Sequence, residues 1–295
     1  MKKIFVFAND KANVAELTHG AALLGGEAVL ITSGAEHGSA AKVYTYPAEL
    51  SAVSVAPQVA ALVGAEGADV LLCESGKDGR LIAGYCAAKL GASPLCDAMS
   101  LALEGDSLVS TRLVYGGGAV KTESAALPAV AVVGAGVFEA GADSAAAEVT
   151  PLPGEADAAA ALTGVSELAA SSANLAAAKR VVGAGRGLSS ADNVPVLEQL
   201  AGILGAEIGC TRPAAEEEHW YTKDRYIGVS GCVLKPNLYL AVGISGQIQH
   251  MVGINQAGVI FAIDKNENAP IVEQSDYCLI GDVNTVLPAL IEKLK

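Results

Sequence analysis

Aromatic residues and long apolar runs are both scarce in this 295-residue chain. Aromatics make up only 4% of the residues, although 52% are hydrophobic. Small and aliphatic residues therefore dominate, as is typical of parallel strands that helices cover on both faces. No apolar run approaches the roughly 20 residues that cross a bilayer. The run IFVF near the start is too short for the core of a signal peptide. We therefore expect no membrane insertion and a cytoplasmic location.

Basic residues are also in deficit. The net charge is −13, and the parts of the chain before and after residue 178 carry −10 and −3. The acidic N-terminal part disfavours binding to nucleic acid and to anionic membranes, which carry the same sign of charge. The nearly neutral C-terminal part is the better place for an anionic cofactor.

Patterns for metal sites and disulfides are missing as well. The six cysteines form no CxxC pair, and none lies near a histidine at metal-ligand spacing. We expect no metal site, and mostly buried free thiols in a reducing cytoplasm. No acid–base pair is evident, which disfavours an enzyme with a substrate of its own.

The first half alternates between strand and helix patterns. Strands are expected in KKIFVFAND, EAVLITSG, DVLLCESG and AVAVVGAG, and helices at 13–24, 55–63 and 80–90. The segment SLALEGDSLVSTRLVYGGGAVKTE alternates in hydrophobicity and has turn signals at 104–106 and 116–118. This segment predicts an antiparallel excursion from a parallel sheet.

Residues 138–178 are rich in Ala and Ser and show no clear core pattern. We interpret them as a loosely structured crossing and place a domain boundary near residue 178. The pattern restarts with AKRVVGAGRG and continues through LYLAVGIS, GVIFAID, YCLIG and a helix at 284–294. We predict an α/β fold with two doubly wound parallel-sheet domains, residues 1–178 and 179–295.

Glycine turns follow the apolar runs of the second half, and ligands bind at the carboxyl ends of strands in such sheets. The turn GAGRG begins a dinucleotide fingerprint, but Leu188 stands where GxGxxG requires glycine. A nicotinamide site is therefore disfavoured, and tight turns explain these glycines equally well. Arg186 in this turn would complement a diphosphate. In LYLAVGISGQIQHMVG, a strand and a Gly-Ser-Gly turn precede a helix that opens on Gln247, which predicts an anion site.

The run GISGQIQH, followed by FAIDKNENAPI and YCLIGD, resembles the signature of the electron transfer flavoprotein alpha subunit. Residues 179–295 look like the flavin domain of that family almost throughout. Within the family, the branch associated with carnitine and nitrogen fixation is the most similar. Residues 1–178 resemble the first domain more loosely, through SGKDGRLIAGYCAAKLGASPLCDA and VYGGGAVKTE. The resemblance implies that the C-terminal domain is Rossmann-like and binds FAD.

Matching positions carry over as expected FAD contacts. Those expected at the ring and the phosphates are Arg186, Thr211, Arg212, Ile227, Gly228, Val229, Ser230 and Gly231. Those expected around the pyrophosphate and the pyrimidine side of the ring are Ser245, Gly246, Gln247, Ile248, Gln249 and His250, and those along the adenosine end are Asp264 and Asp282. The family usually has Asn where this chain has Asp264, and an ionised carboxylate cannot donate to adenosine. Lys265 would compensate its charge.

Several of these side chains suit a flavin that gains negative charge on reduction. A protonatable His250 and the cation of Arg212 would stabilise that charge, and the Ser230 hydroxyl would lie near flavin N5. The alternatives are a core histidine that caps its own helix and a simple turn serine. For Tyr226, interior packing or a subunit contact is favoured over stacking on a ring. For the charge run at 216–218, a solvated loop is the default.

The resemblance implies the alpha subunit of a heterodimer that shuttles electrons between an acyl-CoA dehydrogenase and a downstream acceptor. A beta subunit would cover the first domain and carry AMP or a second FAD. In electron-bifurcating relatives, that second flavin takes hydride from NADH. The chain would then be an electron carrier rather than an enzyme with its own substrate. The alternative is a nucleotide-binding regulatory or structural α/β protein without redox work.

Overall fold

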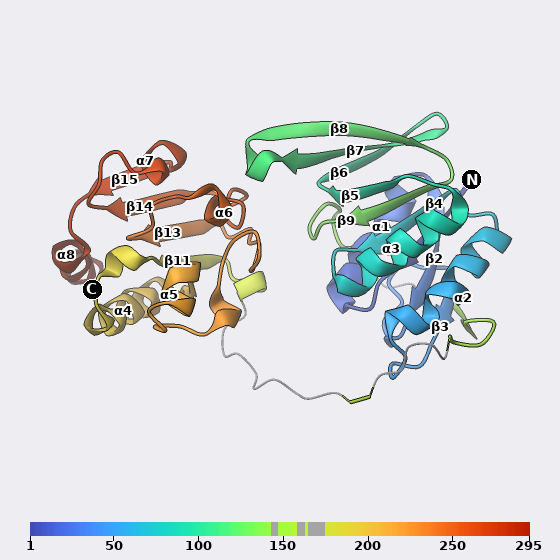
Figure 1. Cartoon of the computed structure of the whole chain (residues 1–295), viewed down its shortest axis with the longest axis horizontal. Coiled ribbons are helices and arrows are strands. Elements are labelled where there is room, and N and C mark those ends of the chain that lie inside the picture. The colour runs from blue at the N-terminus through green and yellow to red at the C-terminus, as the bar shows by residue number, and fades with distance from the viewer. Residues whose placement is uncertain (143–146, 158–162, 165–174) are drawn as a thin grey trace. The chain divides into compact units, whose positions relative to one another are not determined.

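The computed structural model describes residues 1–142, 147–157, 163–164 and 175–295. The chain divides into two compact units, shown in Figure 1. The first unit comprises Met1–Val114 and Ala119–Ser166, and the second comprises Tyr115–Gly118 and Glu167–Lys295. The boundary expected near residue 178 stays a prediction, because residues 165–174 beside it lie outside the described part.

The first unit is built on a parallel sheet of seven described strands, in the order β10-β3-β2-β1-β4-β9-β5. The strands are β1 (Lys2–Phe7), β2 (Gly26–Thr32), β3 (Lys42–Thr45), β4 (Val70–Glu74), β5 (Pro94–Ala98), β9 (Ala129–Val133) and β10 (Glu148–Pro151). The helices are α1 (Lys11–Leu23), α2 (Ala52–Ala65) and α3 (Lys77–Leu90).

Both faces of this sheet are buried. Phe5 and Phe7 of β1 pack against α2 and α3, whereas Ile4 and Val6 face α1 on the other side (Figure 1). All four side chains are inaccessible to solvent. This two-sided burial explains the continuous apolar runs of the sequence.

A separate antiparallel sheet follows β5, in the order β6-β7-β8. Its strands are β6 (Ser100–Glu104), β7 (Ser107–Val114) and β8 (Ala119–Ala126). Leu108 and Ala125 join the core on the α1 side of the main sheet. The predicted antiparallel excursion is confirmed.

Three strands of the first unit are not predicted from the sequence: β3, β5 and β10. They are short, and β10 ends in Pro151 at the edge of the sheet, where a missing N–H is tolerated. The strand β10 corrects part of the loose crossing expected over 138–178, because Leu152 after it lies in the core. Within that crossing, residues 143–146, 158–162 and 165–174 lie outside the described part.

The carboxyl end of the first sheet is occupied by a side chain of its own. Strand order reverses between β1 and β4, the usual place for a ligand in such sheets. There the carboxylate of Glu74 accepts hydrogen bonds from the backbone N–H groups of Asn9 (3.1 Å) and Asp10 (3.3 Å) and from the amide of Asn13 (3.1 Å). Glu74 is 8% exposed. A buried anion of the protein thus takes the position that a phosphate could take.

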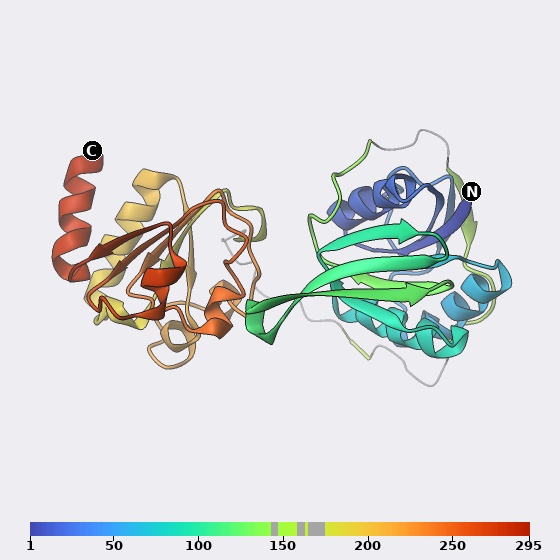
Figure 2. The ribbon, with the colours of Figure 1, turned by 90° about the horizontal axis from the view of Figure 1, so that it is seen from above.

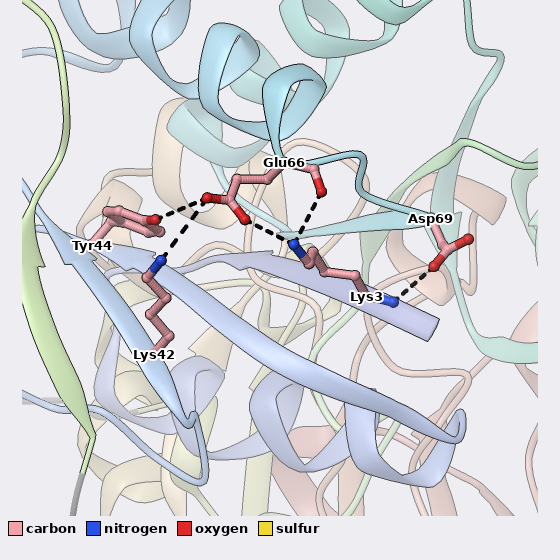
Figure 3. A network of polar contacts seen from close by, with 5 residues as sticks. All are labelled: Lys3, Lys42, Tyr44, Glu66 and Asp69. Carbon is pink, nitrogen blue, oxygen red and sulfur yellow. Dashed lines mark hydrogen bonds and ion pairs between the residues drawn. The ribbon is translucent and has the colours of Figure 1, made fainter. Parts of the chain in front are cut away.

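An ionic network ties elements together at the opposite, amino-terminal end of the strands (Figure 3). The ammonium of Lys3 donates to the carboxylate of Glu66 at 2.8 Å, and the Lys3 backbone N–H donates to Asp69 at 2.8 Å. The hydroxyl of Tyr44 donates to the second Glu66 oxygen at 3.4 Å, and Lys42 lies 3.9 Å from that oxygen. Glu66 is the C-cap residue of α2, so the network anchors this helix to β1 and β3.

The second unit has a parallel sheet in the order β12-β11-β13-β14-β15. The strands are β11 (Arg180–Ala184), β12 (Glu207–Cys210), β13 (Leu238–Val242), β14 (Ile260–Asp264) and β15 (Tyr277–Ile280). The α-helices are α4 (Val194–Leu204), α5 (Arg212–Glu216), α6 (Ile248–Met251), α7 (Pro270–Gln274) and α8 (Val283–Leu294). Single 3-10 turns are η1 (Tyr115–Gly117), η2 (Leu175–Ala177), η3 (Arg186–Leu188), η4 (Ala191–Asn193) and η5 (Lys223–Arg225).

Alternate residues of β13 supply two cores. Leu240 and Val242 face α4 and α8, which lie side by side in Figures 1 and 2. Tyr239 and Ala241 face the opposite side, where α6 and α7 pack. The predicted class, α/β with doubly wound parallel sheets, is confirmed in both units.

Two helix starts of the second unit are unusual, and the second of them differs from the expectation. The side chain of Asn193 does not cap α4; it donates to the carbonyl of Leu188 at 2.7 Å and to Asn284 at 2.6 Å. The expected helix after Gln247 is a single turn of four residues. A helix this short has only a small summed dipole, so its charge effect is weaker than expected.

All six cysteines are free. Cys73, Cys86 and Cys210 are buried, and burial raises the pKa of Cys86 and Cys210 to about 12. The other three are partly exposed, so the expected burial holds for half of them. No helix among the described residues has the length and apolarity needed to cross a membrane.

Replacing Glu74 with Gln should lower the free energy of unfolding by roughly 1–3 kcal/mol, because an amide NH2 would face backbone donors that the carboxylate now satisfies. Denaturant titration measures this change. The matched control is Glu27→Gln, at the exposed position of the otherwise buried β2, which should change stability little. Equal stability of the two variants would contradict the anchoring role of Glu74.

Candidate cofactor site

A cavity of about 700 Å³ opens at the carboxyl end of the second sheet. Its walls come from the turns that follow β11, β12, β13 and β14 and from the loop around 226–230. Strand order reverses between β11 and β13, so the cavity lies at the switch point of the sheet. Ten expected FAD contacts line it: Arg186, Thr211, Arg212, Val229, Ser230, Ser245, Gln247, Gln249, His250 and Asp264.

The turns after β11 and β13 touch backbone to backbone. The N–H of Gly187 donates to the carbonyl of Gly243 at 2.9 Å, and a Cβ on Gly187 would lie 2.6 Å from the Gly243 Cα. Gly243 has a φ of +61°, which also favours glycine. Leu188, which breaks the GxGxxG pattern, is fully buried in the core. The glycines of GAGRG therefore allow a tight turn that packs closely against the turn after β13.

The turn after β13 presents backbone donors to the cavity. In the described part of the chain, no acceptor faces the N–H groups of Ser245, Gly246 or Gln247. Gly246 has a φ of +80°, and a side chain there would collide with the backbone of Ile271. Ser245 and Gln247 line the cavity, so their N–H groups are available to an anionic ligand.

Both expected arginines reach the cavity, and each is paired with a glutamate. The Nε of Arg212 donates to Glu216 at 2.6 Å, and Arg186 lies 3.6 Å from Glu217. Hydrogen bonding to Arg212 lowers the pKa of Glu216. The expected solvation of the charge run at 216–218 is borne out, because all three glutamates are exposed, but Glu216 belongs to α5 and not to a loop. An anionic ligand at these arginines must compete with carboxylates of the protein.

A buried side-chain oxygen in the cavity wall also has no partner among the described residues. The hydroxyl of Thr211 is buried and makes no hydrogen bond, although Thr211 lines the cavity beside Arg212. Tyr226 and Ser230 also line the cavity, and their hydroxyls lie 3.2 Å apart. Tyr226 therefore faces the cavity, and the expectation of interior packing is wrong for its hydroxyl end.

His250 lines the cavity but turns its ring nitrogens toward the protein. Its Nε2 lies 2.8 Å from the hydroxyl of Tyr239, and its Nδ1 lies 3.1 Å from the carbonyl oxygen of Ile227. The side chain is 6% exposed, and burial lowers its pKa from 6.5 to about 4. The expected protonatable histidine is therefore neutral at pH 7. The alternative of a core histidine is thus borne out in its burial, but the ring bonds Tyr239 and Ile227 and does not cap its own helix.

Six expected contacts lie outside the cavity lining: Ile227, Gly228, Gly231, Gly246, Ile248 and Asp282. Ile227 is fully buried, and the N–H of Gly231 donates to Gly228 at 3.0 Å to close a turn. Ile248 is 57% exposed. The structure gives Ile227, Gly228 and Gly231 a framework role, and their contact with a cofactor stays a prediction.

The two expected adenosine contacts meet in a small recess beside the main cavity. Asp264 and Asp282 line this recess of about 40 Å³, and Lys265 belongs to both spaces. The Asp264 carboxylate accepts from the Asn266 N–H at 2.9 Å, and that of Asp282 accepts from the Asn284 N–H at 2.8 Å. Both carboxylates therefore also serve as turn or helix caps.

The lining also contains residues that were not expected as cofactor contacts: Gly187, Pro213, Tyr226, Gly243, Ile244 and Lys265. Gly243 and Lys265 directly follow strands, so the rule for carboxyl ends of strands could have identified them. Tyr226 lies 16 residues beyond β12, and no local signal brings it to the rim.

These features suit an anionic ligand of cofactor size. The volume is that of a small-molecule or cofactor site. Two arginines and the turn of Ser245 supply positive potential, and the unpartnered Thr211 hydroxyl and the Tyr226–Ser230 pair supply hydrogen bonds. In the described ranges, no group of three or more His, Cys, Asp and Glu side chains could hold a metal ion. The residues present therefore fit a dinucleotide.

We expect acid to destabilise the second unit through His250. Its folded-state pKa of about 4 lies below the unfolded value. The stabilisation that neutral His250 gives to the folded state is therefore full above pH 6.5 and is lost as the pH falls toward 4. The loss should total roughly 3 kcal/mol at about 1.4 kcal/mol per pH unit. Denaturant titrations of the wild type and His250→Asn measure it, because other titrations cancel in the difference. If the difference in free energy of unfolding between the two proteins stays constant between pH 7 and 4.5, His250 is not buried in its neutral form.

Comparison with known proteins connects this site to a family. Residues 174–255 match the model of the electron transfer flavoprotein FAD-binding domain, and residues 10–167 match that of the electron transfer flavoprotein domain. Protein FixB of two Escherichia coli strains and of Shigella dysenteriae is 36% identical over 304 residues, which covers 98% of this chain and 96% of FixB. A solved structure from Mycobacterium smegmatis, described as a thiamin diphosphate-dependent enzyme, aligns with a TM-score of only 0.24 at 13% identity, over 95% of this chain and 62% of that chain. The resemblance drawn from GISGQIQH and YCLIGD is confirmed: the chain belongs to the electron transfer flavoprotein alpha-subunit family.

Proposed function

We propose that the chain binds FAD in the cavity of the second unit and carries electrons as the alpha subunit of a heterodimeric electron transfer flavoprotein. The observation that carries this proposal is the cavity at the switch point, whose wall holds two arginines and several hydrogen-bond donors without partners among the described residues. The strands and turns that build most of its walls fall within the stretch matched by the FAD-binding-domain model, residues 174–255.

The residues of the chain divide into phosphate-binding and ring-facing groups. Arg186 and the N–H groups of Ser245 and Gln247 suit the pyrophosphate, because they combine positive charge with free backbone donors. Arg212 and Ser230 suit the ring system, and Asp264 suits the adenosine end. When bound, the flavin supplies reversible electron uptake and release.

Charge at the ring is set by Arg212 and its partner. With FAD bound, the Arg212 guanidinium would stabilise an anionic ring more than a neutral one and would therefore raise the reduction potential. Glu216 at 2.6 Å offsets part of that charge. Neutral His250 contributes through the position of its neighbours and not through charge.

The family implies a beta-subunit partner, and the finer assignments belong to this proposal. The beta subunit would carry AMP or a second FAD, and the electron donors and acceptors would be an acyl-CoA dehydrogenase and a downstream redox protein. Electron bifurcation with NADH would depend largely on the beta chain. Six free thiols support a reducing, cytoplasmic location.

The decisive test is the cofactor itself. We expect the chain, purified with its beta subunit, to be yellow and to release FAD on denaturation. Arg186→Ala should weaken FAD binding about tenfold, because a phosphate partner is lost. Arg180→Ala, at the opposite end of β11, should bind FAD as the wild type does. A colourless protein that takes up no FAD on reconstitution would favour the non-redox alternative.

Substitution of the Arg212–Glu216 pair should move the flavin potential in opposite directions. Arg212→Ala should lower the first reduction potential and Glu216→Gln should raise it, each by less than about 60 mV, because the guanidinium is exposed and screened. Glu218→Gln, on the exposed neighbour, is the control. Potentiometric titration measures all three, and shifts of the same sign for Arg212→Ala and Glu216→Gln would refute the pairing.

A further inference from the structure

A buried chain of hydrogen bonds runs behind the cavity wall. Tyr239 of β13 is fully buried, and its hydroxyl lies 2.8 Å from Nε2 of His250. The Nδ1 of the same ring lies 3.1 Å from the carbonyl oxygen of Ile227. Both ring nitrogens are therefore engaged by the protein.

The two partners specify one tautomer of His250. A carbonyl oxygen only accepts, so Nδ1 must carry the proton that bonds Ile227. In a neutral imidazole, Nε2 is then an acceptor, and the Tyr239 hydroxyl donates to it. The other neutral tautomer would set the Nδ1 lone pair against the carbonyl oxygen. A charged imidazolium would be buried without an acidic side chain in hydrogen-bond or ion-pair contact with it among the described residues.

The position of the Tyr239 hydroxyl is fixed by packing. It occupies the space into which a Cβ on Gly183 of β11 would project. The side chain of Ile244 closes the same space, at 2.9 Å from that Cβ position. The hydroxyl thus has a place only because β11 carries a glycine opposite it.

His250 in turn holds the loop that forms one wall of the cavity. Its Nδ1–H bonds the Ile227 carbonyl, and two residues later the N–H of Val229 donates to the carbonyl of Gln249 at 2.8 Å. Gly253 lies so close to this loop that a Cβ there would be 2.6 Å from the Gly228 nitrogen. Val229 and Ser230 line the cavity immediately beyond these anchors.

We propose that Tyr239 is a positioning residue, which fixes His250 as its Nδ1–H tautomer and thereby sets the position of the Val229–Ser230 wall. The consequence for FAD rests on the proposed function, whereas the tautomer and the anchored loop do not. His250 presents no ring N–H to the ligand; it acts through the loop.

The test uses the full-length chain labelled with 15N-histidine, with and without FAD. Long-range 1H–15N spectra at pH 7 should show His250 with its proton on Nδ1. Tyr239→Phe should introduce the other tautomer, speed amide exchange of Val229 at least tenfold, weaken FAD binding about fivefold and shift the flavin absorption spectrum. The control Tyr221→Phe removes another buried hydroxyl of the second unit, one without a partner and outside the cavity, and should change none of these.

A matched pair of variants separates the hydrogen bond from packing. His250→Asn keeps an amide N–H near the position of Nδ1 and should retain part of the Val229 protection. His250→Leu, of similar size, should lose it. Equal protection in the two variants would overturn the positioning role.

The possible failures can be told apart. A wild-type spectrum with the proton on Nε2, or on both nitrogens, would overturn the inference even if FAD binds. An unchanged tautomer and unchanged exchange in Tyr239→Phe would do the same. A chain that binds no FAD but shows the Nδ1–H tautomer, dependent on Tyr239, would refute the proposed function and leave the positioning role standing.

Discussion

The close approach of the turns after β11 and β13 is the constraint on which the site depends. Helices and loops bury both faces of the central strands β11, β13 and β14, so polar groups gather at the ends of these strands. At the carboxyl end, Gly187 and Gly243 touch through their backbones, and the chain then leaves on opposite sides of the sheet. The cavity lies at the crevice between these exits, and the backbone donors of Ser245 and Gln247 belong to the packed turn after β13.

The two units differ in what satisfies the polar groups at the switch point of the sheet. In the first unit, the carboxylate of Glu74 accepts hydrogen bonds from the backbone donors at the switch point, so the protein itself supplies their acceptor. In the second, the donors of Ser245 and Gln247 and the hydroxyl of Thr211 have no partner in the described part of the chain. The same architecture therefore yields a closed rim in one unit and a ligand-ready rim in the other.

The positive charge at the cavity of the second unit is partly offset by neighbouring carboxylates. Arg186 and Arg212 are each paired with a glutamate, so neither presents an uncompensated charge to the cavity. His250 adds none, because burial favours its neutral form and both of its ring nitrogens have neutral partners. Such a site would bind an anionic cofactor through many moderate contacts and leave its potential adjustable by single charges.

Much of this protein is determined by its sequence alone. The apolar runs and glycine stops indicate the α/β class, the antiparallel excursion and most central strands, because two-sided burial imposes that pattern locally. The motif around Gln247 and His250 locates the site. Only the tertiary structure decides that β10 joins an edge, that Glu74 closes the first rim, and that Glu217 lies beside Arg186. It also decides that His250 is neutral between Tyr239 and Ile227. These properties depend on partners distant in the chain or on the solvent exclusion that folding creates, and no local pattern encodes either.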